Sequence, residues 1–238
     1  MANYGSGDVL VYKLNEKGVP IALLTRLYQA GQGANPDRQN APHAHQAIFL
    51  KHSDQLAVVD LGSDRLHFYG YQGDEFSATP EQSLRLAAGC GPRHLVFNQA
   101  EDRAYVVCEL SETVEILHKK DQWQWMQSVA LYPAKASQQA AGAIRLSSDE
   151  KHLYVSARAQ NQIVVFDVNE QGLVHKAAID CGGQFPRDMN LSPDGRWLVV
   201  ANQHSNNLVS FERDLNTGLL TSKASLDKLD APVCVMPA

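Results

Sequence analysis

Five residues whose side chains can bind anions or transfer protons occur at only two sequence offsets from a recurring apolar residue. Twenty-one residues before that apolar residue are His45, Arg93 and Arg187, and five residues before it are Glu109 and Arg158. The planar fork of an arginine suits a carboxylate or a phosphate, because it donates two parallel hydrogen bonds. A glutamate is a candidate general base, and a histidine takes or gives a proton near neutral pH. The set predicts an anion-binding site that can move a proton.

The recurring apolar residue belongs to an internal repeat that runs through the chain. Residues 2–12 fit the second half of the repeat unit, and fuller copies begin near Ala41, Cys90, Ala140 and Phe185. The apolar residue of each copy is, in order, Val9, Leu66, Val114, Ile163 and Leu208. The intervals between them are 57, 48, 49 and 45 residues. A period of about 40–50 residues built from short strands is typical of a β-propeller blade.

The local patterns agree with a fold made of strands. Apolar residues alternate with period two, as in residues 56–60 and 103–109, and Ser192–Gly195 has the composition of a tight turn. We therefore predict an all-β fold: one β-propeller domain over residues 1–238, with four-stranded antiparallel blades and about five blades present. The alternative is a β-sandwich whose spacing matches a blade by coincidence.

The register of the repeat also places the polar residues. One series begins the first strand of each blade, and the other follows the end of the second strand. These strands are antiparallel neighbours, so both series lie at the same edge of the sheet. The first strand of a blade lines the central channel, so the five side chains are predicted to surround one mouth of it. Tyr4, Leu61, Gly142 and Gln203 hold the equivalent places in the other copies. The alternative is that the charged residues form salt bridges between blades and cap the channel.

Several stretches resemble the lactonase family of seven-bladed β-propellers, which includes sugar-lactone hydrolases and muconate-lactonising enzymes. The stretches are residues 41–49, 91–97, 105–117 and 185–211, and the likeness extends over essentially the whole chain. The resemblance implies catalytic roles for His45, Arg93 and Glu109, and a weaker substrate-anchoring role for Arg187. The repeat register adds Arg158 as a substrate-binding residue, and we include His43 and Gln203 as further substrate-binding candidates.

The resemblance implies a hydrolase of a sugar lactone such as 6-phosphogluconolactone. Glu109 or His45 would activate water, Arg93 would stabilise the oxyanion, and Arg158 and Arg187 would hold the phosphate or carboxylate of the substrate. A muconate-lactonising cyclase would use the same residues. The remaining alternative is a propeller without enzymatic activity that serves as a binding scaffold, because a fold does not dictate a function.

The proposed chemistry requires neither a metal nor another cofactor. The alternate spacing of His43 and His45 would place both imidazoles on one side of a regular strand, which allows a metal. A single pair of histidines is weak support for a metal site, so no metal is predicted.

The number of blades departs from the family pattern. Seven blades of about 49 residues need roughly 340 residues, so about two blades are expected to be absent from the N-terminal side, and Ala231-Pro232 is expected to open another unit. Open blade edges invite pairing with another chain, which predicts a homodimer. Light scattering tests this expectation, and a stable monomer would contradict it.

Composition limits the remaining classes. The net charge of -5 gives no support for binding nucleic acid. The four cysteines have no metal-ligand spacing and are read as free thiols, and the chain shows neither a signal pattern nor a membrane-spanning apolar run, so a cytoplasmic location is predicted. The loop from Gln29 to Ala41 explains the longest interval and is interpreted as a surface insertion, with a lid over the channel mouth as the alternative.

Overall fold

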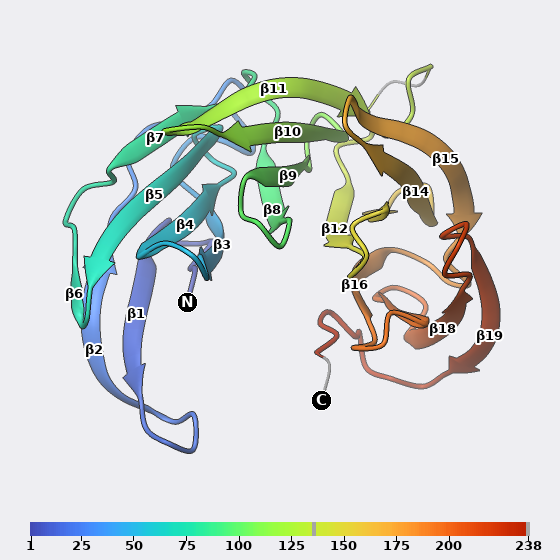
Figure 1. Cartoon of the computed structure of the whole chain (residues 1–238). Coiled ribbons are helices and arrows are strands. Elements are labelled where there is room, and N and C mark those ends of the chain that lie inside the picture. The colour runs from blue at the N-terminus through green and yellow to red at the C-terminus, as the bar shows by residue number, and fades with distance from the viewer. Residues whose placement is uncertain (135–136, 237–238) are drawn as a thin grey trace.

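In the computed structural model, β-sheets stand side by side in an arc, each with its first strand nearest the centre (Figure 1). The structure describes residues 1–134 and 137–236. Within these residues the strands form one two-stranded sheet and four larger antiparallel sheets. The predicted all-β propeller fold is confirmed, and the β-sandwich alternative is wrong.

We call the two-stranded sheet the half-blade and the four larger sheets blades 1 to 4. The half-blade contains β1 (Val9–Leu14) and β2 (Pro20–Leu27). Blade 1 contains β3 (Ala44–Phe49), β4 (Gln55–Asp60), β5 (Arg65–Gln72), the short β6 (Glu75–Phe76) and β7 (Gln82–Arg85). Blade 2 contains β8 (Pro92–Phe97), β9 (Arg103–Cys108), β10 (Thr113–Lys119) and β11 (Trp123–Ala130). Blade 3 contains β12 (Ala141–Leu146), β13 (His152–Ala157), β14 (Gln162–Asn169) and β15 (Gly172–Asp180). Blade 4 contains β16 (Pro186–Leu191), β17 (Trp197–Asn202), β18 (Asn207–Arg213) and β19 (Leu220–Leu226).

The hydrophobic core is divided into layers between adjacent sheets. Phe68 of blade 1 packs with Trp123 of blade 2 in one layer, and Val107 of blade 2 packs with Ile144 of blade 3 in the next. Equivalent layers join blade 3 to blade 4 and the half-blade to blade 1. Because the middle strands of blades 1 to 3 are covered on both faces, they are apolar along most of their length, as in the buried strand β13.

Each complete blade has a β-bulge near the start of its inner strand. In β3, β8 and β16 the extra residue is His45, Arg93 or Arg187, and in β12 the irregularity covers Gly142. A bulge inserts an unpaired residue and turns its side chain away from the regular alternation of the strand. In each blade, the residue twenty-one positions before the apolar repeat residue therefore lies in the bulge. Its side chain leaves the regular alternation of the strand at the same edge of the sheet.

A repeated side-chain contact fixes these inner strands from the preceding blade. The residue two positions before the apolar repeat residue adopts a left-handed conformation, with φ of 56° at Asp64, 53° at Glu112, 56° at Asn161 and 57° at Asn206. Its side-chain oxygen accepts a hydrogen bond from the backbone NH just ahead of the next inner strand. The four acceptor and donor pairs are Asp64 and Gly91 at 2.9 Å, Glu112 and Ala140 at 3.3 Å, Asn161 and Phe185 at 2.8 Å, and Asn206 and Ala231 at 3.0 Å. We call this contact the blade clamp. The backbone NH of Ala231 makes this contact with Asn206, as the residues just ahead of the other inner strands do with their own clamp residues.

The half-blade does not make a blade clamp to blade 1. Its equivalent residue is Gly7, with φ of 72°, and a Cβ there would lie 2.4 Å from the carbonyl oxygen of Pro42, so no other residue fits. The backbone NH of His43 instead donates to Asp60 Oδ1 at 2.7 Å, from the neighbouring strand β4 of the same blade. The position of His45 is thus fixed from within blade 1.

An apolar groove of about 580 Å³ lies between the half-blade and blade 1. Tyr12, Leu14 and Phe49 line it and are exposed, Leu14 by 53%. Exposed apolar surface of this kind marks interaction sites. That a second copy of the chain pairs with the open blade edges stays a prediction.

The four cysteines are free thiols, and three of them are buried. Over residues 1–134 and 137–236, there is no helix of the length and apolarity that crossing a membrane requires.

Candidate active site at the channel mouth

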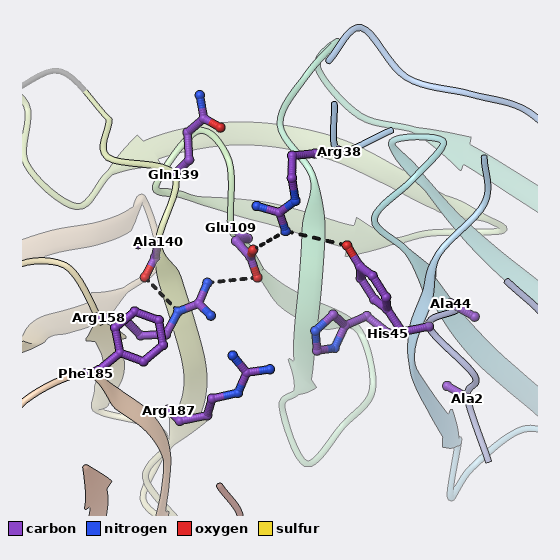
Figure 2. A pocket seen from close by; sticks show the side chains of 11 residues that line it. Ala2, Arg38, Ala44, His45, Glu109, Gln139, Ala140, Arg158, Phe185 and Arg187 are labelled. Carbon is purple, nitrogen blue, oxygen red and sulfur yellow. Dashed lines mark hydrogen bonds and ion pairs between the residues drawn. The ribbon is translucent and has the colours of Figure 1, made fainter. Parts of the chain in front are cut away.

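The inner strands and the loops beside them enclose a cavity of about 600 Å³ (Figure 2). It combines bulged residues of inner strands, residues that follow second strands, and residues from the N-terminal segment and the loop before β3. The lining residues are Ala2, Tyr4, Arg38, Ala44, His45, Glu109, Gln139, Ala140, Arg158, Phe185 and Arg187. Four residues predicted from the repeat, His45, Glu109, Arg158 and Arg187, are therefore brought together here.

The carboxylate of Glu109 is the centre of an ion-pair network. Its Oε2 forms an ion pair with Arg158 Nη2 at 2.9 Å and accepts a hydrogen bond from Arg93 Nε at 3.1 Å, and its Oε1 accepts one from Arg38 Nη2 at 2.6 Å. Burial raises the pKa of Glu109, but the charges and hydrogen bonds of Arg158, Arg38 and Arg93 outweigh it and hold the pKa below its ordinary value. Glu109 is ionised at neutral pH, and both of its oxygens are already occupied.

The arginines on Oε2 are fixed by further bonds. Arg93 Nη1 donates to the carbonyl oxygen of Gly142 at 2.9 Å, and Arg158 donates to the carbonyl oxygens of Ala140 and Ala141 at 3.0 and 3.1 Å. Burial, then the charge of Arg158, lowers the pKa of Arg93 to about 9, so it stays protonated at neutral pH. Arg93 is only 3% exposed and does not line this cavity. Contacts between blades are thus part of the role of these charged residues, as the capping alternative expected.

Arg187 differs from the other arginines. Its side chain extends from the bulge of β16 into the cavity (Figure 2). Its guanidinium makes no hydrogen bond or ion pair with any residue that the structure describes. A guanidinium with all five donors free in a cavity is available to a carboxylate, a phosphate or a developing oxyanion.

His45 points into the same space as Arg187 (Figure 2). Its ring meets those of Tyr4 and His94 edge to face, with centroids 5.7 and 5.0 Å away. Nδ1 is enclosed by protein without a partner, which leaves Nε2 as the nitrogen able to reach the cavity. Burial, followed by the charge of Arg93, lowers the pKa of His45 to about 3. The imidazole is therefore neutral at physiological pH and can accept a proton.

His43 and Gln203 lie outside this cavity. The ring of His43 stacks on Tyr4 with centroids 4.4 Å apart, and its Nδ1 lies 2.8 Å from the carbonyl oxygen of Tyr4. Gln203 lines an adjoining cavity of about 430 Å³, which shares His45 and Arg187 with the first and also contains Arg93. Substrate binding by His43 and Gln203 stays a prediction. In the described part of the chain, no group of three or more histidines, cysteines or carboxylates has a geometry suited to a metal.

Sequence reasoning missed Arg38 as a site residue. It belongs to the loop that was interpreted as a surface insertion, yet its guanidinium reaches Glu109, and its neighbour Gln39 is fully buried. The loop lies outside the repeat, so no register could align Arg38 with the other arginines. The extra length of the first repeat interval was the available signal. Phe185 was missed as well, and its ring lies 5.0 Å from the guanidinium carbon of Arg158.

The comparisons with known proteins agree on one family. The profile described as "Lactonase, 7-bladed beta-propeller" matches residues 1–237. A 6-phosphogluconolactonase of Bacillus subtilis is 35% identical over 240 residues, which cover 98% of this chain and 68% of that relative. A Lactobacillus plantarum protein of known crystal structure superposes with a TM-score of 0.91 at 34% identity, over 98% of this chain and 69% of that one. The periplasmic gluconolactonase of Pseudomonas aeruginosa superposes with a TM-score of 0.86 at 28% identity, over 98% and 68%.

Proposed function

The chain belongs to the lactonase family of seven-bladed β-propellers, and from that premise we propose that it hydrolyses a sugar lactone that carries an anionic group. Three arginines, Arg38, Arg158 and Arg187, line the cavity, and Glu109 is the one carboxylate among its lining residues, so the site has an excess of positive charge. An anionic substrate fits this excess. 6-Phosphogluconolactone is the first candidate, because the relative from Bacillus subtilis is a 6-phosphogluconolactonase.

The proposal is carried by the pairing of Arg187 and His45. One is an unpaired cation and the other is a neutral base, and both line the same cavity. Hydrolysis of a ring ester needs a base for the attacking water and a positive group for the oxyanion. Glu109 is a poorer base, because three guanidiniums already occupy its two oxygens.

The reaction then proceeds in two steps. His45 takes a proton from water as the hydroxide oxygen bonds to the lactone carbonyl carbon, and Arg187 stabilises the oxyanion. The bond between the carbonyl carbon and the ring oxygen then breaks, and the ring oxygen takes the proton from the imidazolium of His45. The product is the open hydroxy acid, and the imidazole is neutral again. Each proton transfer of this kind is worth about 10²–10⁴ in rate.

Arg93 takes a different role from the one that the sequence suggested. Its guanidinium is bonded to Glu109 and to the carbonyl oxygen of Gly142, and it is almost fully buried. We therefore propose that Arg93 orients Glu109 and that Arg187 contacts the substrate. Arg158, which lines the cavity, pairs with the same oxygen of Glu109 as Arg93 does.

The function is tested by following acid release from fresh 6-phosphogluconolactone above the spontaneous background. Wild type is expected to accelerate it, and Arg187→Ala to lower kcat/KM by about 10–100-fold, because a hydrogen bond to a charged group is worth about 1.5–3 kcal/mol. Arg196→Ala is the matched control, since Arg196 is an exposed arginine in the turn at the far end of blade 4. An effect of Arg196→Ala equal to that of Arg187→Ala would contradict the role of Arg187.

Two outcomes would favour the alternative functions. Consumption of a muconate, seen as a change in its ultraviolet absorbance, without hydrolysis of any sugar lactone would favour a lactonising cyclase. No activity on several lactones, together with tight binding of a protein partner, would favour a binding scaffold.

A further inference from the structure

The loop between β2 and β3 is built around the side chain of Gln39. The amide Nε2 of Gln39 donates to the carbonyl oxygen of Leu61 at 2.8 Å and to Asp64 Oδ1 at 2.6 Å, and its Oε1 accepts from the backbone NH of Asn35 at 3.0 Å. Gly33 leaves room for this side chain, because a Cβ there would lie 2.4 Å from the Gln39 amide carbon. The loop therefore has a fixed core that holds the preceding residue, Arg38, beside the cavity.

The two oxygens of Glu109 are held in unequal ways. Oε2 is held by Arg93 and Arg158, whose side chains are 3% and 5% exposed, whereas Oε1 is held by Arg38, which is 36% exposed. Buried ion pairs are costly to break, and exposed ones contribute little. The Arg38 pair is exposed on the side of Arg38 alone, so breaking it costs less than breaking either buried pair, and Arg93 and Arg158 keep the carboxylate in place.

Among the described residues, the guanidinium of Arg38 makes one further hydrogen bond, a long one of 3.5 Å from Nη2 to the hydroxyl of Tyr4. Arg38, Tyr4 and Arg187 all line the cavity, so the anionic group of a substrate can pair with Arg38 while Arg187 stabilises the oxyanion. Oε1 of Glu109 faces the same cavity once Arg38 turns away. A carboxylate oxygen so released is a strong acceptor for a sugar hydroxyl.

We propose that Arg38 is a specificity-determining residue that exchanges its ion pair with Glu109 for the anionic group of the substrate. The exchange frees Oε1 of Glu109 to accept a hydrogen bond from a hydroxyl of the sugar. This inference rests on the proposed function, because it concerns how the same cavity selects among sugar lactones. An anionic lactone draws Arg38 away from Glu109 and so frees Oε1 to accept a hydrogen bond from its own hydroxyl. With a neutral lactone, Arg38 stays paired with Oε1.

The test compares 6-phosphogluconolactone with unphosphorylated gluconolactone for wild type, Arg38→Ala and Arg38→Lys. Arg38→Ala is expected to lower kcat/KM for the phosphorylated lactone by about 10–100-fold, the effect of one charged hydrogen bond, and to leave the value for the neutral lactone unchanged or higher. Arg38→Lys should keep part of the preference, because it keeps the charge and loses the fork. Arg196→Ala is the control. Equal losses on both lactones, or no loss on either, would overturn the proposal.

Two further measurements separate this inference from the proposed function. Inorganic phosphate added to wild type is expected to accelerate hydrolysis of the neutral lactone, and not to do so with Arg38→Ala; equal responses would count against the exchange. Should wild type hydrolyse no lactone, the proposed function fails. Calorimetric binding of 6-phosphogluconate then decides the anion exchange: weaker binding by Arg38→Ala supports it, and equal affinities refute it.

Discussion

Replacing His45 by alanine is expected to lower kcat on 6-phosphogluconolactone by about 100-fold, since the variant has no group to take the proton of the attacking water. This is the lower end of the range for a general base, because a pKa of about 3 makes His45 a weak base at neutral pH. KM should change little, because substrate binding is assigned to the arginines. The side chain lies at a β-bulge, so its removal does not interrupt the strand pairing of β3. His175→Ala is the control, because His175 is exposed on the outer strand β15.

The pH dependence gives a second view of the same residue. A base is active when it is unprotonated, and the pKa of His45 is lowered to about 3. The contribution of His45 to kcat/KM is therefore expected to stay constant from pH 8 down to about pH 5 and to fall only as the pH approaches 3. An inflection near pH 6.5 that disappears in His45→Ala would show instead an ordinary histidine, in an environment unlike the one described.

Replacing Glu109 by glutamine is expected to destabilise the fold by about 3 kcal/mol, the scale for losing one partner of a buried ion pair. Arg93 and Arg158 would remain buried without their counter-charge, and a neutral amide cannot replace it. The two candidate roles of Glu109 predict different results. A general base would lose turnover with little change in stability, whereas a counter-charge would lose stability and keep or increase its affinity for 6-phosphogluconate. Urea denaturation and calorimetry distinguish them.

The pH dependence of stability provides the control for Glu109. Because the pKa of Glu109 is lower in the folded chain, its stabilising contribution is fully present above the unfolded pKa of about 4.3 and is lost as the pH falls through the folded value. The difference in unfolding free energy between wild type and Glu109→Gln should therefore be constant near neutrality and should shrink below about pH 4. A constant difference down to pH 3 would contradict the counter-charge role.

Most of the fold and of the candidate site could be predicted from the internal repeat. One apolar residue per blade set the register, and a constant offset from it located His45, Arg93 and Arg187, since each blade places its bulge at the same step. Such information is available from sequence because strand pairing and turn chemistry recur in each copy. The location of the residues followed from it, while their roles depend on contacts between copies.

Three features could not be predicted, each for a physical reason. Arg38 lies in a loop without a repeat equivalent, and its position depends on the buried bonds of Gln39. His43 was expected to share a face with His45, but it precedes β3 and the bulge breaks the alternation, so its ring turns to Tyr4. The burial of Arg93 comes from the packing of β8 beside β12, where the carbonyl oxygen of Gly142 accepts its hydrogen bond.

The blade clamps attach the strands that carry the catalytic groups to different blades. The strands that carry Arg93 and Arg187 are each tied to the blade before them, through Asp64 and Asn161, whereas the strand of His45 is tied to its own blade through Asp60. If the blades shift relative to one another, Arg187 moves with blade 3, whereas Arg93 and His45 both keep their place relative to blade 1. The distance between His45 and Arg187 therefore depends on how tightly successive blades pack against one another. Turnover should fall when the packing between blades loosens, well before the strands within a blade separate.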